Sequence, residues 1–136
     1  ESLLHQGFRR FFVVNGHSGN HLPDRLADFQ MEGVIRVRWY DWWRGPAAGD
    51  FARAQGLRID HGNWCQNFPF TRVSDVPDGV KEEVNMSYVD AGFGVREVLG
   101  DGSFGGPYAI DEDDMQTFFQ RVVEEAAVQL RDMGHD

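Results

Sequence analysis

The sequence has little cysteine, proline and lysine, and it has no long apolar run. Its single cysteine, Cys65, cannot form an internal disulfide, so the cytoplasm is the expected compartment. No apolar stretch is long enough to span a bilayer and no signal-peptide pattern opens the chain, so we expect no membrane association. Thirteen Lys and Arg against twenty-two Asp and Glu give a net charge of −9, which argues against nucleic acid as a partner.

In its length and composition the chain is typical of a globular protein. The chain has 136 residues, of which 41% are hydrophobic and 26% charged. That length and composition predict a single domain over residues 1–136 with a core of its own. A chain of this size buries about two-thirds of the surface that its unfolded form exposes.

Hydrophobic periodicity predicts an α/β fold. The apolar run at 10–15 is typical of a strand buried on both faces, helical spacing follows at 22–31, and a second strand covers 34–40. Strand, helix and strand in so few residues indicate a parallel pair. A long amphipathic helix follows Asp111, its predicted N-cap, and ends at Gly134. We therefore expect a layered, mostly parallel sheet with flanking helices.

The loop after the first strand is the first candidate site. In parallel α/β sheets, ligands bind at the carboxyl ends of the strands. Gly16 and Gly19 allow a sharp turn there, and Asn15 and Asn20 can hydrogen-bond the loop to itself. This arrangement presents His17 at the sheet edge. The alternative is that His17 only caps the following helix.

A second polar cluster occupies residues 60–67. It combines an imidazole, a carboxylate, a thiol and three amides, with too few Cys and His for a structural zinc site. Cys65 paired with a histidine is a possible nucleophile. The alternative is a helix N-terminus with its capping residues.

These stretches resemble the creatininase family of amidohydrolases. The family has a Gly-aromatic-Arg lead, an apolar strand and an Asn-Gly-His-x-x-Asn loop. It also has a His-Ala-Gly-x-x-Glu-Thr segment, a late Gly-Asp-Pro-x-x-Ala loop and a long final helix. The corresponding stretches of this chain occur in the same order, at 7–10, 12–20, 61–67, 98–101 with 106–109, and the final helix.

The resemblance implies a metal-dependent hydrolase of cyclic or linear amides of small molecules, with a two-metal centre and a symmetric oligomer. It implies that His17 is a metal ligand and that His61 lies over the substrate as an acid, base or oxyanion-stabilising group. Composition and place add four candidate substrate contacts, for which a core or interface role is the alternative. These are Trp42, Trp43, Trp64 and Asn63.

Two positions depart from the family pattern. Gly19 stands where creatininase has a glutamate ligand, and Gln66 stands where relatives have the glutamate of the second segment. A neutral amide oxygen binds a divalent ion more weakly than a carboxylate does. We therefore expect one or two ions of Zn, Mn or Fe, with Gln66 as a weak second ligand.

The family's other metal ligands lie in an N-terminal half that has no counterpart in these residues. We therefore expect this chain to form about the C-terminal half of a creatininase-like fold. A separate chain would supply the N-terminal half, through processing or split genes, unless the chain is an artefactual fragment. The alternative function is a catalytically silent structural or binding subunit that has lost metal ligands.

Overall fold

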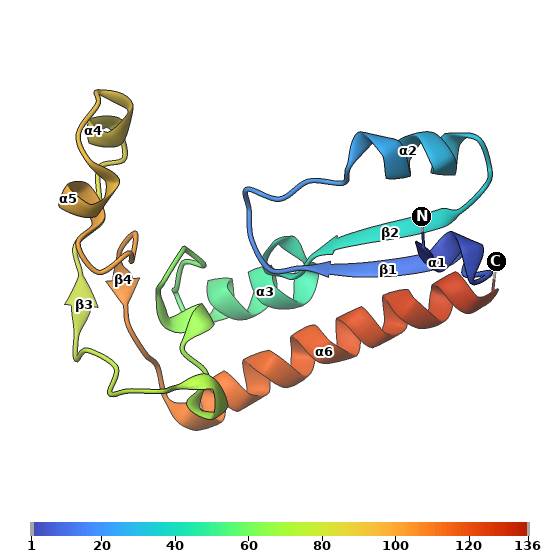
Figure 1. Ribbon diagram of the computed structural model, residues 1–136. Helices are drawn as coiled ribbons and strands as arrows, with labels where there is room; N and C mark the ends of the chain where they lie inside the picture. Colours follow the sequence, from blue (N-terminus) through green and yellow to red (C-terminus); the bar gives the residue numbers. More distant parts are fainter. Residues whose placement is uncertain (1, 136) are drawn as a thin grey trace. The chain divides into compact units, whose positions relative to one another are not determined.

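The computed structural model describes residues 2–135 and divides into two compact units (Figure 1). The strand-pair unit contains the residues up to Ala47 and from Arg121 onward, and the aromatic unit contains Ala48–Gln120. The sequence predicts one domain, whereas the contacts of the chain separate these two units. Among the described residues, no helix is both long and apolar enough to cross a membrane.

The strand-pair unit is built on two parallel strands. Its first elements are α1 (Ser2–His5), β1 (Arg10–Asn15), α2 (Asp24–Met31) and β2 (Arg36–Asp41). β1 and β2 pair in parallel along their whole length, with Asn15 opposite Asp41 at the carboxyl ends. The predicted strand–helix–strand unit and its parallel pairing are confirmed, and β1 has the predicted bounds.

β2 begins two residues later than the apolar pattern predicts. The backbone N–H groups of Val34 and Ile35 both donate to the carbonyl oxygen of Phe29, at 2.9 and 3.3 Å. These two residues therefore complete the last turn of α2 and are not available for the sheet. Arg36 is the first residue of β2, and its N–H donates to the carbonyl of Arg9, the residue before β1 (2.7 Å).

The prediction that β1 is buried on both faces is wrong. Val14 is 56% exposed, and Phe11, Phe12 and Val13 are only half-buried. The layers packed on the pair therefore leave part of its apolar surface open, and within residues 2–135 β1 has a single neighbouring strand.

One face of the pair lies against α6 (Glu112–His135). The Arg10 guanidinium donates to the carbonyls of Met133 and Gly134, at 3.0 and 3.1 Å.

The core of the aromatic unit is a cluster of rings. Its elements are most of α3 (Pro46–Ala54), η2 (Trp64–Gln66), η3 (Pro69–Thr71) and the first part of α6. The ring of Trp64 lies 6.0 Å from that of Phe51 and 5.0 Å from that of Phe118. Trp64 and Phe118 are fully buried, and Phe68 stacks on Phe118 at 6.1 Å.

The rest of the aromatic unit has little regular structure. It consists of β3 (Val80–Lys81), α4 (Ser87–Asp90), α5 (Val95–Leu99) and β4 (Gly106–Pro107), and β3 pairs antiparallel with β4. The glycine-rich stretch at 92–106 is mostly loop, apart from α5 and the start of β4. The Lys81 ammonium donates to the carbonyls of Leu99 (2.6 Å) and Ser103 (2.8 Å) and to the Asp101 carboxylate.

α6 confirms the predicted start of the final helix. The Asp111 carboxylate accepts hydrogen bonds from the N–H groups of Asp113 (2.9 Å) and Asp114 (3.4 Å), so Asp111 is the N-cap. The helix does not end at Gly134 but continues to His135. Its apolar stripe is only partly covered, because Val123 and Leu130 are 46% and 54% exposed.

Candidate functional site

The ends of β1 and β2 meet in a polar cluster, which we call the Asn15 cluster: Asn15, His17, Asn20 and Asp41. The Asn15 side chain is 3% exposed. Its amide nitrogen donates to the Asp41 carboxylate (2.7 Å) and to the carbonyl of His17 (2.9 Å). Its amide oxygen accepts from the N–H of His17 (3.2 Å) and the side chain of Asn20 (3.0 Å). One buried amide thus fixes the whole loop to the strand ends, as the prediction for Asn15 and Asn20 required.

The His17 ring closes the loop from the other side. Its Nδ1 accepts a hydrogen bond from the Gly19 N–H at 3.0 Å. A nitrogen that accepts carries no proton, so the proton of the neutral ring lies on Nε2.

The two loop glycines act differently from the prediction. Neither Gly16 nor Gly19 has a positive φ, so neither is needed for a sharp turn. A Cβ at Gly19 would lie 3.1 Å from His17 Nδ1, whereas one at Gly16 would meet nothing within 4 Å. Gly19 is therefore small so that the His17 ring fits against the backbone.

Asp41 is a member of the cluster that sequence reasoning missed. Besides the Asn15 amide, its carboxylate accepts the Trp39 indole N–H (2.9 Å), and Arg44 lies 3.8 Å away. The available signal was its position as the last residue of the second parallel strand. Two of the predicted substrate contacts follow directly in η1 (Trp42–Arg44). Trp42 and Trp43 are half-buried and meet edge to face, with centroids 5.8 Å apart.

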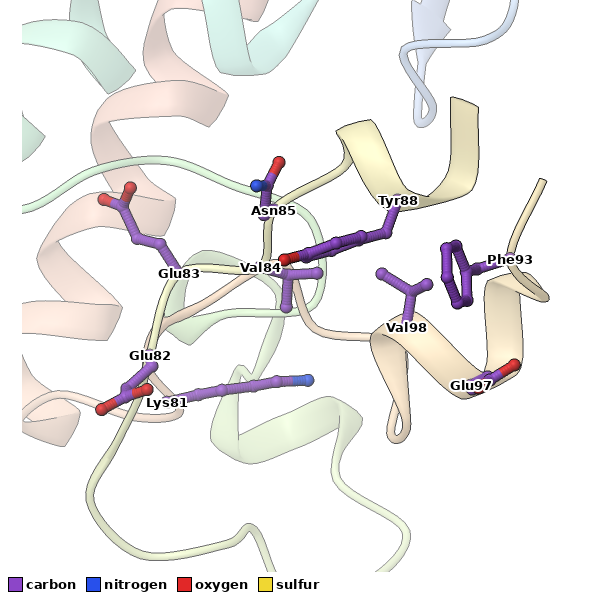
Figure 2. Close-up of a pocket in the computed structure, with 9 residues that line it drawn as sticks. All are labelled: Lys81, Glu82, Glu83, Val84, Asn85, Tyr88, Phe93, Glu97 and Val98. Atoms are coloured by element: carbon purple, nitrogen blue, oxygen red, sulfur yellow. The ribbon is translucent and has the colours of Figure 1, made fainter. Parts of the chain in front are cut away.

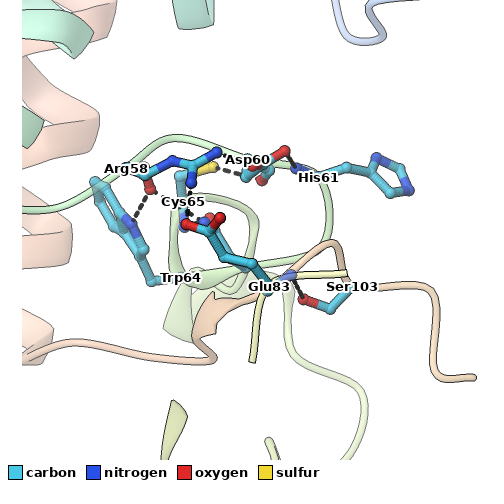
Figure 3. A network of polar contacts seen from close by, with 9 residues as sticks. Arg58, Asp60, His61, Trp64, Cys65, Glu83 and Ser103 are labelled. Carbon is cyan, nitrogen blue, oxygen red and sulfur yellow. Dashed lines mark hydrogen bonds and ion pairs between the residues drawn. The ribbon is translucent and has the colours of Figure 1, made fainter. Parts of the chain in front are cut away.

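The other predicted site residues belong to the aromatic unit. His61 is exposed, and its backbone N–H donates to the Asp60 carboxylate (2.9 Å). Figure 3 shows its ring directed away from the neighbouring Arg58–Asp60–Glu83 ion pairs, and the ring packs 5.0 Å from that of Phe104. Gln66 is exposed as well, and its side-chain oxygen accepts the Gly62 N–H at 2.8 Å.

Asn63 and Trp64 do not form the wall of an open site. Both are fully buried in the aromatic unit. The carbonyl oxygen of Arg58 accepts from both side chains, at 3.0 Å from the Asn63 amide nitrogen and 2.8 Å from the Trp64 indole nitrogen. Figure 3 shows the bond from Trp64. Asn63 also accepts the Cys65 N–H at 3.2 Å, which caps η2. Their placement supports the core role that the sequence left as the alternative.

Cys65 has the environment of a structural thiol. It is buried, and its sulfur lies 3.5 Å from the carbonyl oxygen of Asp60. Burial raises the pKa of the Cys65 thiol to about 12. The reactive thiolate is therefore scarce at neutral pH, which argues against Cys65 as a nucleophile.

The described residues do not make a metal site by themselves. Within 2–135, no group of three or more His, Cys, Asp and Glu side chains is placed to hold an ion. Catalytic metal sites generally use about three protein ligands. A metal at His17 would thus need ligands from residues outside this set.

A pocket of about 440 Å³ lies elsewhere in the aromatic unit, between β3, α4 and α5 (Figure 2). Tyr88 and Phe93 meet edge to face there, with centroids 5.7 Å apart, and Val84 and Val98 line the space beside them. None of the predicted site residues lines this pocket.

No family model, no curated protein and no solved structure matches this chain.

Proposed function

We propose that this chain is one subunit of a metal-dependent, creatininase-like amidohydrolase that cleaves the C–N bond of a small amide. The observation that carries the proposal is the Asn15 cluster. A buried amide at the carboxyl end of β1 bonds to the backbone of His17 and to the Asp41 carboxylate, at the edge where parallel sheets bind ligands. The layered α/β fold proposed for the assembly extends this parallel pair, and the assembly is proposed to be cytoplasmic and symmetric.

The proposal gives each candidate residue a defined part. His17 is the metal ligand contributed by this chain, and His61 is the acid or base. Trp42 and Trp43, next to the Asn15 cluster in sequence, are the wall that holds a flat substrate. Because the described residues lack a complete ligand set, we derive no reaction step through the metal, and a partner chain is proposed to supply the missing ligands.

A metal at His17 must compete with a hydrogen bond. Binding through Nδ1 displaces the Gly19 N–H. Binding through Nε2 moves the ring proton to Nδ1, which then no longer accepts from Gly19. Either route therefore requires a change in the loop.

A second candidate function is a catalytically silent structural or binding subunit. It is favoured by the local partners of both proposed ligands. His17 accepts the Gly19 N–H and Gln66 accepts the Gly62 N–H, so each side chain already closes a turn of its own loop.

Metal analysis of the native assembly distinguishes the two functions. The chain would be tagged in its own cells, and its assembly purified and analysed for Zn, Mn and Fe. The hydrolase proposal expects one or two ions per site in the wild type and loss of metal and amidase activity in His17→Ala. His21→Ala, an exposed histidine of the same loop, is the matched control and should keep both. A metal-free wild-type assembly would favour the silent subunit, and metal retained in His17→Ala would remove His17 from the site.

Gln66→Glu tests the second proposed ligand. A carboxylate in place of the amide should raise the metal occupancy of the assembly, while its oxygen still accepts the Gly62 N–H. Unchanged stoichiometry and affinity would show that residue 66 does not face the metals.

A further inference from the structure

The side chain of Asn15 joins two separate segments of the strand-pair unit. Its amide has four hydrogen-bond partners, and three of them belong to the loop after β1: the N–H and the C=O of His17 and the side chain of Asn20. The fourth partner is the carboxylate of Asp41 at the end of β2, 26 residues further along the chain. Asp41 is therefore the partner through which this amide attaches the loop to the neighbouring strand.

The Asp41 carboxylate is itself held in place by the sheet. The parallel register sets Asp41 opposite Asn15. Its Oδ1 accepts the Asn15 amide (2.7 Å) and the Trp39 indole N–H (2.9 Å), and its Oδ2 lies 3.8 Å from the Arg44 guanidinium. Hydrogen bonds to an ionised acceptor are shorter and stronger than those between neutral groups. The carboxylate thus gives the Asn15 amide a strong anchor at a fixed position.

The charge of Asp41 also fixes which way the Asn15 amide faces. A carboxylate only accepts hydrogen bonds, so the amide turns its nitrogen toward Asp41 and its oxygen toward the loop. In that orientation the oxygen accepts the His17 N–H (3.2 Å), and the amide nitrogen also reaches the His17 carbonyl (2.9 Å). Both backbone groups of His17 are thus placed by one amide whose direction Asp41 determines.

We propose that Asp41 is a positioning residue, which acts through the Asn15 amide to hold the His17 backbone at the strand ends. The value of this position for metal binding rests on the proposed function, whereas the positioning itself rests on these contacts alone. The loop change that a metal requires involves the His17 ring and the Gly19 N–H. The bonds from Asn15 reach the His17 backbone instead, so they can persist while the ring changes partner.

The alternative is that Asp41 only satisfies a buried amide. Asn15 is 3% exposed, and a buried polar group that loses its partner is costly. Asp41→Asn separates the two roles, because it keeps the shape of the side chain and an oxygen that can accept from Asn15 but removes the charge. A residue that only satisfies the amide tolerates this change. A positioning residue does not, and the effect falls on the loop, whose residues 16–20 are all exposed.

Hydrogen exchange resolved to single amides makes this test. The tagged protein would be purified from its own cells, in the assembly that it forms there, as wild type and as Asp41→Asn. The amides of His17 and Asn20, which donate within the Asn15 cluster, should exchange about 10-fold faster in the variant. The Arg36 amide, bonded at the other end of the strand pair, is the internal control and should not change. Asp28→Asn, an exposed carboxylate of α2, is the matched control for the lost charge.

Two further variants test whether Asp41 acts through Asn15. Trp39→Phe keeps a large ring but removes the indole N–H that holds the carboxylate, so it should accelerate the same two loop amides to a smaller extent. Asn15→Ser removes the amide, and Asp41→Asn should add little in that background, because residues that act as a unit are not additive. Circular dichroism checks that each variant folds, and Trp39→Phe keeps the test open if Asn15→Ser does not.

Chelator competition on the same assemblies tests the link to metal binding. Asp41→Asn should lower the apparent metal affinity about 10-fold, the lower end of the losses that follow when a residue supporting a metal ligand is changed. Asp28→Asn should leave the affinity unchanged.

The outcomes separate this inference from the proposed function. Unchanged exchange of the His17 and Asn20 amides in Asp41→Asn, or an equal acceleration of the Arg36 amide, would overturn the positioning role. A metal-free wild-type assembly in which Asp41→Asn still loosens the loop would overturn the hydrolase and leave the positioning standing. Unchanged metal affinity in a variant with a loosened loop would overturn the part that this position plays in metal binding.

Discussion

The strand-pair unit and the aromatic unit differ in how completely they bury their apolar side chains. The first has regular strands and helices but leaves Val14, Val123 and Leu130 about half-exposed. The second has only short helices and two-residue strands apart from α3 and the start of α6, yet it encloses Trp64 and Phe118 completely. Regular secondary structure therefore does not imply a closed core. A core is closed only where each apolar face packs against another element of the chain.

The aromatic unit closes because its irregular backbone is held at defined points. One carbonyl oxygen, that of Arg58, accepts from both the Asn63 amide and the Trp64 indole. These bonds satisfy polar groups that burial would otherwise make costly. The strand-pair unit satisfies its polar groups at the Asn15 cluster equally well. Its apolar faces, however, are not fully covered by other elements of the unit.

The largest effect is expected where the closed core is broken. Trp64→Ala removes a fully buried ring that contacts Phe51 and Phe118 and leaves the Arg58 carbonyl with one donor fewer. We expect the free energy of unfolding of the aromatic unit to fall by about 3–5 kcal/mol. Amide exchange at Phe51 and Phe118 measures that change. The matched control is Trp42→Ala, a half-buried indole in the strand-pair unit, for which we expect a loss of about 1–2 kcal/mol. Equal losses from the two substitutions would remove the distinction between the units.

Local patterns predicted the regular elements of the fold. The bounds of β1, its parallel pairing with β2 and the N-cap Asp111 all follow from periodicity and capping, which act over a few residues. The depth of burial could not be predicted in the same way. The Phe-Phe-Val-Val run suits a strand covered on both faces, but the elements that pack on the sheet from elsewhere in the chain decide whether it is covered. Within the described residues β1 has one neighbour.

The same distinction between local patterns and contacts of distant segments applies to the candidate site. Asn15 and Asn20 were expected to bond their loop to itself, which is a local property, and they do. Asp41 was missed, because its contact with Asn15 depends on the register of two strands separated by twenty residues in the chain. For Trp64 and Asn63 the sequence leaves substrate contact and core as alternatives, because composition does not distinguish an aromatic wall from an aromatic core.

A smaller effect is expected at the junction between β2 and α3 in the strand-pair unit. The Glu125 carboxylate accepts the Ala47 N–H at 2.6 Å and so caps the start of α3. Burial and this nearby carboxylate raise the pKa of Tyr40 to about 12. A Cβ at Gly45 would lie 3.0 Å from Glu125 Cδ and closer still to its Oε1. Gly45→Ala should therefore displace Glu125 and lower the free energy of unfolding by about 1–2 kcal/mol.

Gly49→Ala is the control for this substitution, because it lies within α3 and a Cβ there meets nothing within 4 Å. It should raise stability by up to about 1 kcal/mol, since alanine is the better helix former. Chemical denaturation of both variants gives the comparison. In a Glu125→Ala background, Gly45→Ala should cost little more. Additive losses would show that the glycine is needed for a reason other than Glu125.

The smallest effect is expected at the surface of the aromatic unit, where Lys81 holds the loop that contains Asp101. Hydrogen bonds from Lys81, then from the Tyr108 hydroxyl and the Ser103 N–H, lower the pKa of Asp101 to about 2. A lowered pKa means that this carboxylate stabilises the fold above its ordinary value of 3.8 and ceases to do so as the pH falls toward 2. Lys81→Met should raise the pKa of Asp101 toward 3.8, as followed by the carboxyl carbon in an NMR titration. The stability difference between wild type and variant should therefore shrink as the pH is lowered through this range. Arg53→Met, which removes the exposed ion pair with Asp50 at 2.8 Å, is the control and should change stability little at any pH. An Asp101 pKa that stays near 2 without Lys81 would assign the shift to Tyr108 and Ser103 instead.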